Sequence, residues 1–393
     1  MSGSRLGRLA LVAPAVLLAV ALAGCSGPIL ANPPAAHPRP TAAPSGTPRP
    51  ADPQPVVLPS DDGAHDRLTE WWYDTGHLVD ENGGRWGFEY VVFRAERGSF
   101  PVTWASHLAL TDETGQQFHY AQRAEIGPQV NVAAMAAAGF NLAIRGLDPA
   151  DPTTFTRAPW TMTGANGTDK LAASALPTEA LGDGAGSAFG LSLTLATVKP
   201  PALHDGDGYV DFQTAGGSYY YSRTSMSARG TITVGGKTLH VSGTAWFDHQ
   251  WGDFISVGGG GWDWFAVNLA DGTDMTLSLV RAADGTYPLI YGTLVDMAGD
   301  TTRLGPADFT VDVTGHWTSP KTGAVYPAGW AIKLPAQDLA INLTPSVAQQ
   351  ELDTRATTGV VYWEGSQRVS ATRGGQPLGG EAYVELTGYS PAR

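Results

Sequence analysis

One stretch of the sequence, residues 243–269, combines acids and an imidazole with large indole rings. Its titratable and indole residues are Asp248, His249, Asp253, Asp263, Trp246, Trp251, Trp262 and Trp264. Burying an unpaired charge is costly, or it shifts the pKa of the group toward the neutral form. A chain that gathers such groups among indole rings therefore builds either an internal hydrogen-bond network or a chemical site. We expect this stretch to line an apolar pocket and to supply its polar groups.

The chemistry that suits these residues is acid catalysis on an apolar molecule. A carboxyl group in an indole-lined pocket can keep its proton at neutral pH, because loss of water raises its pKa. Asp248 could then give its proton to an alkene, and the ring faces of Tyr73 and Trp246 could stabilise the resulting cation. His249 or Glu70 could orient or deprotonate the attacking water. The predicted catalytic residues are therefore Asp248, His249 and Glu70.

A wider set of residues is expected to contact the ligand. These residues are Trp71, Tyr73, His77, Glu89, Arg94, His107, Trp246, Trp251 and Asp253. Glu89 lies in an aromatic strand, where it would either serve the pocket or pair with Arg94. A single histidine inside a strand, such as His107, is usually a hydrogen-bonded core or edge residue. The sequence contains no Gly-x-Ser-x-Gly elbow and no His-x-x-x-His pair, so we predict no serine nucleophile, no metal site and no cofactor.

The same residues also fit a protein that binds an apolar molecule without chemistry. In that interpretation Asp248, His249 and Glu89 form a buried network that fixes the geometry of a β-barrel. Five tryptophans are predicted to be core residues outright: Trp72, Trp262, Trp264, Trp330 and Trp363. Barrels of the lipocalin type enclose cavities for such ligands. The sequence therefore leaves two alternatives, an enzyme and a carrier.

The elements that must position these residues are predicted to be β-strands. Residues 85–94 alternate with a period of two and are largely apolar on both faces, which indicates a strand covered on both sides or one lining a barrel. Residues 231–241 form the clearest hairpin, with two glycines at the turn. Short strands with almost no amphipathic helix predict an all-β fold. Because domains usually contain ~100–200 residues, we predict two tandem β-domains, residues 60–250 and 251–391.

The N-terminal segment has the composition of an export signal. Residues 1–24 carry two arginines ahead of an apolar run and precede Cys25, the only cysteine of the chain. The Leu-Ala-Gly-Cys ending resembles a bacterial lipobox, so we expect lipidation at Cys25 to anchor the protein to the outer side of the cell membrane. Residues 25–59 are rich in proline, which predicts a disordered tether. The net charge of −13 disfavours binding to nucleic acid. The oligomeric state is not predicted.

Several motifs, in order along the chain, resemble those of the AttH-like and carotenoid 1,2-hydratase family, whose members are often labelled secreted hydrolases. The matching motifs are Glu70-Trp71-Trp72-Tyr73, Gly76-His77-Leu78, Asp248-His249-Gln250-Trp251-Gly252, Tyr362-Trp363-Glu364-Gly365 and Tyr383-Val384-Glu385-Leu386-Thr387-Gly388-Tyr389. The resemblance implies two lipocalin-like β-barrels with an apolar ligand site in one of them or between them.

The resemblance also implies a reaction. In the hydratases of this family an aspartate protonates an isolated double bond, and Asp248 matches that position best, with Asp253 as the alternative. The implied partner is a small hydrophobic molecule of isoprenoid or lipid type. The expected fold is accordingly an all-β pair of lipocalin-like barrels, and the expected activity is that of a hydratase or a hydrolase.

Overall fold

The computed structural model describes residues 51–97, 100–127, 139–146, 158–212, 216–254 and 259–390. The predicted export signal, Cys25 and most of the predicted tether lie outside these ranges. Within them the regular structure consists of β-strands and short 3₁₀ turns, η1 (Ser60–Asp62), η2 (His204–Gly206) and η4 (Pro335–Gln337). None of the described helical segments is long and apolar enough to cross a membrane. The prediction of an all-β fold is confirmed.

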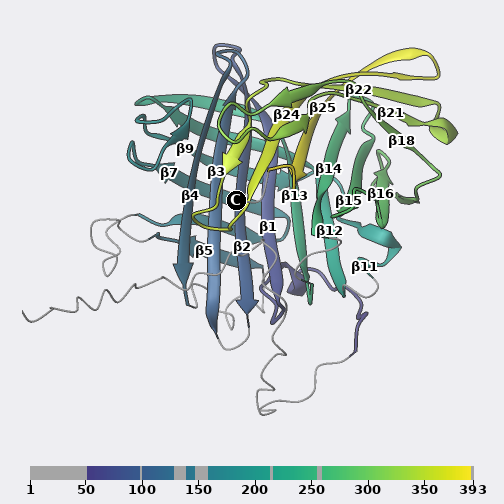
Figure 1. The fold of residues 1–393 in the computed structure, drawn as a ribbon, viewed down its shortest axis with the longest axis horizontal. Coiled ribbons are helices and arrows are strands. Elements are labelled where there is room, and N and C mark those ends of the chain that lie inside the picture. Colours follow the sequence, from purple (N-terminus) through teal and green to yellow (C-terminus); the bar gives the residue numbers. More distant parts are fainter. Residues whose placement is uncertain are drawn as a thin grey trace, which may run out of the picture.

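The N-terminal part of the described chain forms a 13-stranded antiparallel sheet (Figure 1). Its strands are β1 (Thr69–Asp80), β2 (Arg85–Arg97), β3 (Phe100–Asp112), β4 (Gln117–Ile126), β5 (Phe140–Ile144), β6 (Trp160–Ala165), β7 (Thr168–Ala175), β8 (Leu181–Gly182), β9 (Phe189–Thr197), β10 (Ala202–Leu203), β11 (Tyr209–Asp211), β12 (Gly217–Val234) and β13 (Lys237–Gly252). The order β5-β6-β7-β9-β12-β13-β1-β2-β3-β4-β8 places β1 between β13 and β2. The β12–β13 hairpin turns at Gly235 and Gly236, both with positive φ, as the sequence predicted.

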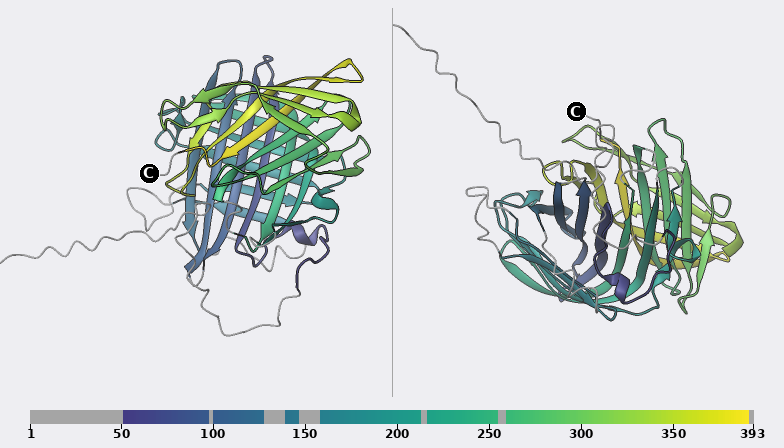
Figure 2. Two further views of the ribbon diagram at one scale, coloured as in Figure 1. Left: turned by 45° about the vertical axis from the view of Figure 1, so that its right-hand side comes forward. Right: turned by 90° about the horizontal axis from the view of Figure 1, so that it is seen from below.

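The C-terminal part forms a ten-stranded sheet in the order β17-β16-β15-β14-β25-β24-β22-β21-β18, with β23 beside β24. Its strands are β14 (Gly259–Leu269), β15 (Asp274–Ala282), β16 (Leu289–Val295), β17 (Thr301–Leu304), β18 (Thr310–Val313), β21 (Trp330–Leu334), β22 (Leu339–Pro345), β23 (Glu351–Asp353), β24 (Val361–Arg373) and β25 (Gln376–Thr387). A separate pair joins β19 (His316–Thr318) to β20 (Val325–Pro327). Both large sheets curl into half-open barrels (Figure 2), which is a two-domain lipocalin-like arrangement. The first sheet ends at Gly252 and the second begins at Gly259.

The strands where the two sheets meet are apolar on both faces. In β2, Phe88 and Tyr90 pack in the core of the first sheet, whereas Val91 and Phe93 belong to a cluster between the sheets. Trp264 joins that cluster from the second sheet. Each face of β2 is therefore covered, which confirms the interpretation of residues 85–94. Core positions are also confirmed for four of the five predicted tryptophans, Trp72, Trp264, Trp330 and Trp363.

Residues 51–59, which the sequence placed in the tether, lie against the first sheet. Asp52 forms an ion pair with Arg67 at 2.6 Å and accepts a hydrogen bond from the Tyr219 hydroxyl at 2.7 Å. The side chains of Val56 and Leu58 pack against the core of that sheet. The prediction of disorder is therefore wrong for residues 51–59, because these contacts fix this part of the proline-rich segment.

Candidate functional site

A cavity of about 580 Å³ lies between the two curled sheets. Its walls carry aromatic rings from both sheets, among them Trp71, Tyr73, Phe93, Trp262, Trp264 and Tyr362. Pockets of ~300–1,000 Å³ hold drug-sized ligands, so this space can enclose an extended apolar molecule. The site therefore lies between the domains, which the sequence had left open.

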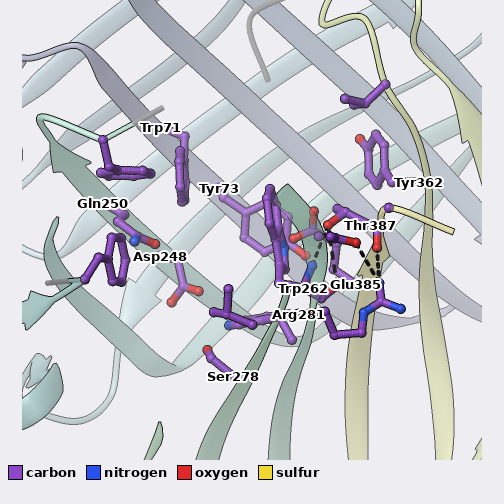
Figure 3. A pocket seen from close by; sticks show the side chains of 18 of the residues that line it. Trp71, Tyr73, Asp248, Gln250, Trp262, Ser278, Arg281, Tyr362, Glu385 and Thr387 are labelled. Carbon is purple, nitrogen blue, oxygen red and sulfur yellow. Dashed lines mark hydrogen bonds between the residues drawn. The ribbon is translucent and has the colours of Figure 1, made fainter. Parts of the chain in front are cut away.

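Strand alternation decides which residues reach this cavity. In β1, Trp71 and Tyr73 point into it, and in the neighbouring β13 so do Asp248 and Gln250 (Figure 3). Tyr73 lies directly opposite Asp248 in the β1–β13 register. Because successive side chains of a strand point to opposite faces, the residues between them are directed into the first barrel. Every second residue in the segments 70–73 and 248–251 thus contributes to the cavity wall.

Trp262 is only partly buried, which corrects the prediction of a core position, whereas Trp264 is buried in the cluster between the sheets and lines the cavity as well. In β14 they share the face that turns toward the first sheet, whereas Phe265 and Val267 fill the core of the second sheet. Both indoles line the cavity. A strand covered on both sides gives no sequence signal that tells its cavity face from its core face.

Asp248 is a buried carboxyl group whose hydrogen-bond donors are all neutral. The Tyr220 hydroxyl donates to Oδ2 at 2.6 Å, the Trp246 indole donates to Oδ1 at 2.7 Å, and the Ser222 hydroxyl also donates to Oδ1. The Trp264 indole donates to the Tyr220 oxygen at 3.0 Å, which leaves the phenol proton for Asp248. Burial raises the pKa of Asp248 to about 6, and these hydrogen bonds limit the rise.

A buried histidine stands behind Asp248. His204 Nε2 lies 2.7 Å from Ser222 Oγ, and His204 Nδ1 lies 2.8 Å from Thr293 Oγ1. Each hydroxyl can donate or accept, so this chain can be oriented in either direction. In one direction Ser222 donates a hydrogen bond to ionised Asp248. In the other direction Ser222 accepts a hydrogen bond from protonated Asp248. The surroundings of Asp248 therefore accommodate both of its protonation states.

Three further carboxyl groups surround the cavity. Glu89 and Glu385 line it, and Glu364 accepts a hydrogen bond from the cavity residue Tyr73 at 2.7 Å. Burial raises the pKa of Glu89 to about 8 and that of Glu385 to about 7, and burial together with the charge of Glu89 raises the pKa of Glu364. These acids are shared between β2, β24 and β25. A cavity walled by raised-pKa acids can exchange protons near neutral pH.

The lining side chains include one cation, Arg281. Its guanidinium lies 3.7 Å from the Asp263 carboxylate and 3.8 Å from the centre of the Tyr389 ring. Burial raises the pKa of Asp263 to about 6, opposed by the charge of Arg281. Figure 3 shows Arg281 close to Thr387 and Glu385, on the other side of the cavity from Asp248. The charged residue is thus placed away from the proposed acid.

His249 and Glu70, the other predicted catalytic residues, lie on the opposite face of the sheet. His249 Nε2 contacts Glu70 Oε1 at 3.1 Å, and His65 Nδ1 contacts the same oxygen at 2.7 Å. Although burial alone would raise the pKa of Glu70, the imidazoles of His65 and His249 lower it to about 2. The prediction that either residue serves a water molecule beside Asp248 is wrong, because adjacent residues of a strand alternate in direction.

The same cluster holds two residues that were predicted to contact the ligand. Arg94 lies 3.9 Å from Glu70 and donates to the His65 carbonyl at 2.7 Å, so neither ligand contact nor pairing with Glu89 is observed. The Trp251 ring stacks on His65 at 4.0 Å inside the first barrel. The ligand atoms offered by His65, Glu70 and His249 lie within 4.8 Å of one another, a spacing that could hold a metal ion. The close guanidinium of Arg94 disfavours a cation there.

The remaining predicted ligand residues lie near the cavity but do not line it. Asp253 pairs with Arg67 at 3.1 Å beyond the end of β13, which removes it as the alternative acid. His77 Nε2 contacts the Ala382 carbonyl at 3.1 Å, where the sheets meet. His107 is hydrogen-bonded to the cavity residue Tyr362 at 2.7 Å. Trp246 contacts Asp248 rather than the open space.

The acids Glu364 and Glu385 were missed, although both lie in motifs that the sequence showed. In residues 362–365 and 383–389, an acid follows a tyrosine at a spacing of two within an apolar strand. That spacing places tyrosine and acid on one face of each strand. Tyr220, Ser222 and His204 carried no comparable signal, because the fold brings them to Asp248 from other segments.

The fold and the site together define a class: two half-open, lipocalin-like barrels that enclose an acid-containing aromatic cavity between them. The chain belongs to the AttH-like family, whose model matches residues 49–389. This assignment agrees with the resemblance seen in the sequence motifs. Among curated proteins, no sequence matches the chain significantly.

Two solved structures are similar to this one over nearly the whole described fold. A Nitrosomonas europaea protein described as a candidate AttH has a TM-score of 0.71 and 29% identity, covering 87% of this chain and all of that one. Kievitone hydratase from Nectria haematococca has a TM-score of 0.61 and 15% identity, covering 85% of this chain and 93% of that one. The second similarity shows a shared fold alone.

Proposed function

We propose that this protein is a hydratase-like or hydrolase-like enzyme that uses Asp248 as a proton donor to a hydrophobic substrate. The observation that carries the proposal is the state of Asp248, a carboxyl on the wall of an aromatic cavity that is held by neutral donors only. A carboxyl group with a pKa of about 6 has its protonated form within reach near neutral pH and can give the proton up at small cost. Kievitone hydratase, which has the same fold, is by its name a hydratase.

In the hydration form of the reaction, the Asp248 O–H bond breaks and a C–H bond forms at one alkene carbon. The cation left on the other carbon faces the rings of Trp71 and Tyr73, whose π-electrons stabilise positive charge. Water then forms the C–O bond, and the proton that it loses returns to Asp248. Atoms and charge balance, and the acid is regenerated.

The test compares the body of the protein, residues 51–393, with its Asp248→Asn variant. Small apolar molecules that co-purify with each are identified by mass spectrometry. We expect an alkene or ester substrate on the variant and its hydrated or cleaved product on the wild type. The same unmodified molecule on both would instead establish a carrier, the second function that fits an apolar cavity of this size.

We also propose export and lipid anchoring at Cys25, which the sequence of residues 1–25 supports. An exported enzyme would meet hydrophobic substrates outside the cytoplasm, at or near the membrane. Expression of the full chain in a bacterium, followed by mass analysis of the mature N-terminal peptide, tests this. We expect an acylated Cys25 on the wild type and a soluble, unacylated product from Cys25→Ala.

A further inference from the structure

A second hydrogen-bond chain, ending on Glu89, differs from the chain behind Asp248 in one respect: its direction is fixed. It runs from Gln122 through Thr357, His107 and Tyr362 to Glu89. The distances are 2.8 Å from Thr357 Oγ1 to Gln122 Oε1, 3.1 Å from His107 Nε2 to Thr357 Oγ1, 2.7 Å from His107 Nδ1 to the Tyr362 oxygen, and 2.8 Å from that oxygen to Glu89 Oε1.

The far end of the chain can only accept protons. The Gln122 amide nitrogen donates to the Asp353 carbonyl at 2.9 Å, which turns its oxygen toward Thr357. The other neighbour of the Thr357 hydroxyl is the Thr354 carbonyl at 3.2 Å, which is also an acceptor. The Thr357 proton is therefore used on an acceptor in either case. Its oxygen must receive the hydrogen bond from His107 Nε2–H.

For a neutral His107, this fixes the protons along the chain. A neutral imidazole carries one N–H, so a proton on Nε2 makes Nδ1 of His107 an acceptor. The Tyr362 hydroxyl then donates to His107 and has no proton left for Glu89. The short contact between Tyr362 and Glu89 is satisfied when Glu89 itself carries the proton and donates to Tyr362.

The alternative assignment places the same proton on His107 and leaves Glu89 ionised. Both side chains are fully buried, and separated charges at such positions are strongly disfavoured. Burial lowers the pKa of His107 to about 3 and raises that of Glu89 to about 8. The other groups that face this pair are the acids Glu364 and Glu385 and the phenol of Tyr73, none of which would stabilise a carboxylate at Glu89.

We propose that Gln122, Thr357, His107 and Tyr362 form a positioning chain that holds Glu89 as a protonated acid on the cavity wall at neutral pH. Asp248 can cycle between its two protonation states, whereas Glu89 stays neutral at pH 7. A neutral Glu89 suits an uncharged ligand, since an ionised carboxylate beside these rings would attract a cationic one. This inference extends the proposed function of the cavity, but it rests on hydrogen-bond geometry and burial and not on the role of Asp248.

The test measures the charge of Glu89 without any substrate. Infrared difference spectra between the intact protein and Glu89→Gln are recorded from pH 5 to pH 9. We expect the signal of a protonated carboxyl at Glu89 to persist at pH 7. In Thr357→Val the terminal acceptor is lost and the chain can reverse, so this signal should titrate about one pH unit lower. Thr358→Val is the matched control, because the Thr358 hydroxyl contacts the hydroxyl and carbonyl of Thr354 but none of the four chain residues, and its loss should leave the titration unchanged.

A second readout needs no substitution at Glu89. In ¹⁵N-histidine spectra of the wild type, His107 should be neutral with its proton on Nε2 throughout this pH range. A carboxylate signal for Glu89 at pH 7, a His107 proton on Nδ1, or identical titrations in the two threonine variants would each overturn the proposal. None of these readouts involves turnover, so their failure would leave the proposed role of Asp248 standing.

Discussion

The two faces of the β1–β13 strand pair hold buried carboxyl groups in opposite electrostatic states. On the barrel face, Glu70 is fully buried and contacts two imidazoles, and its pKa falls to about 2. On the cavity face, Asp248 is 3% exposed and contacts only hydroxyl and indole donors, and its pKa rises to about 6. Burial is nearly the same at the two positions. The charge of the partners decides whether a buried carboxyl becomes a stabilising anion or an available acid.

This difference predicts separate effects on activity and stability. Asp248→Asn should reduce turnover by ~10²–10⁴-fold, the usual contribution of a positioned general acid. At pH 4, where Asp248 keeps its proton, its free energy of unfolding should change by less than about 1 kcal/mol, because asparagine resembles the protonated acid and can keep neutral partners. Turnover assays on the substrate identified by mass spectrometry, together with urea unfolding, check both numbers. A folded variant with full turnover would remove Asp248 from the mechanism.

Glu70→Gln should show the reverse pattern. Removing one partner of a buried ion pair costs ~3–5 kcal/mol, because the remaining charge is left without compensation. His65, His249 and Arg94 would lose their shared carboxylate. We expect a large loss in the free energy of unfolding, measured in urea at pH 7. Turnover per folded molecule should stay within a few-fold of wild type, and a selective loss of turnover would show that the barrel face takes part in the reaction.

The two faces should also respond to pH with opposite signs. Glu70 has a lowered pKa, so its contribution is complete above about pH 4.5 and is lost as the pH falls toward 2. Asp248 has a raised pKa, so folding is penalised as the pH rises from about 4, and the penalty is complete above about pH 6. A pKa that differs by about two between the folded and unfolded states changes the free energy of unfolding by ~3 kcal/mol.

The measurement is the free energy of unfolding at pH 4 and pH 8 in wild type and Asp248→Asn. The variant should lose less stability than wild type between these values, by an amount on the order of 3 kcal/mol. Glu70→Gln is the control, because Glu70 is already ionised in the folded protein over most of this interval. Parallel curves for wild type and Asp248→Asn would mean that Asp248 is ionised already at pH 4.

How much the sequence could predict follows from the same comparison. The alternation in residues 85–94 and the two-glycine hairpin were enough to predict the all-β fold. The family motifs were enough to predict two barrels. Asp248 was found because an acid among indoles is unusual in itself. The prediction that Asp248 acts together with His249 and Glu70 is wrong, because neighbouring residues of a strand point to opposite faces of the sheet.

Other parts of the site depend on contacts that no local pattern records. His204 is linked to Asp248 through Ser222, and Ser222 lies 18 residues from His204 in the sequence. His107 lies 255 residues from Tyr362. The sequence contains each of these residues but does not show that they are in contact, because the packing of one sheet on the other sets these distances. The cavity face of β14 was likewise hidden, since Trp262 and Trp264 are as apolar as Phe265 and Val267 on the core face of the same strand.

The smallest expected effect concerns Asp253, which the sequence could not separate from Asp248 as the acid. Asp253 lies after the end of β13, its side chain is 35% exposed, and its carboxylate pairs with Arg67. Partly exposed ion pairs contribute ~0–1 kcal/mol, and Arg67 keeps its second pair with Asp52 when Asp253 is neutralised. Asp253→Asn should therefore change the free energy of unfolding by less than about 1 kcal/mol and leave turnover unchanged. A loss of turnover comparable to that of Asp248→Asn would show that Asp253 is the catalytic acid, and the distinction between the two faces would no longer hold.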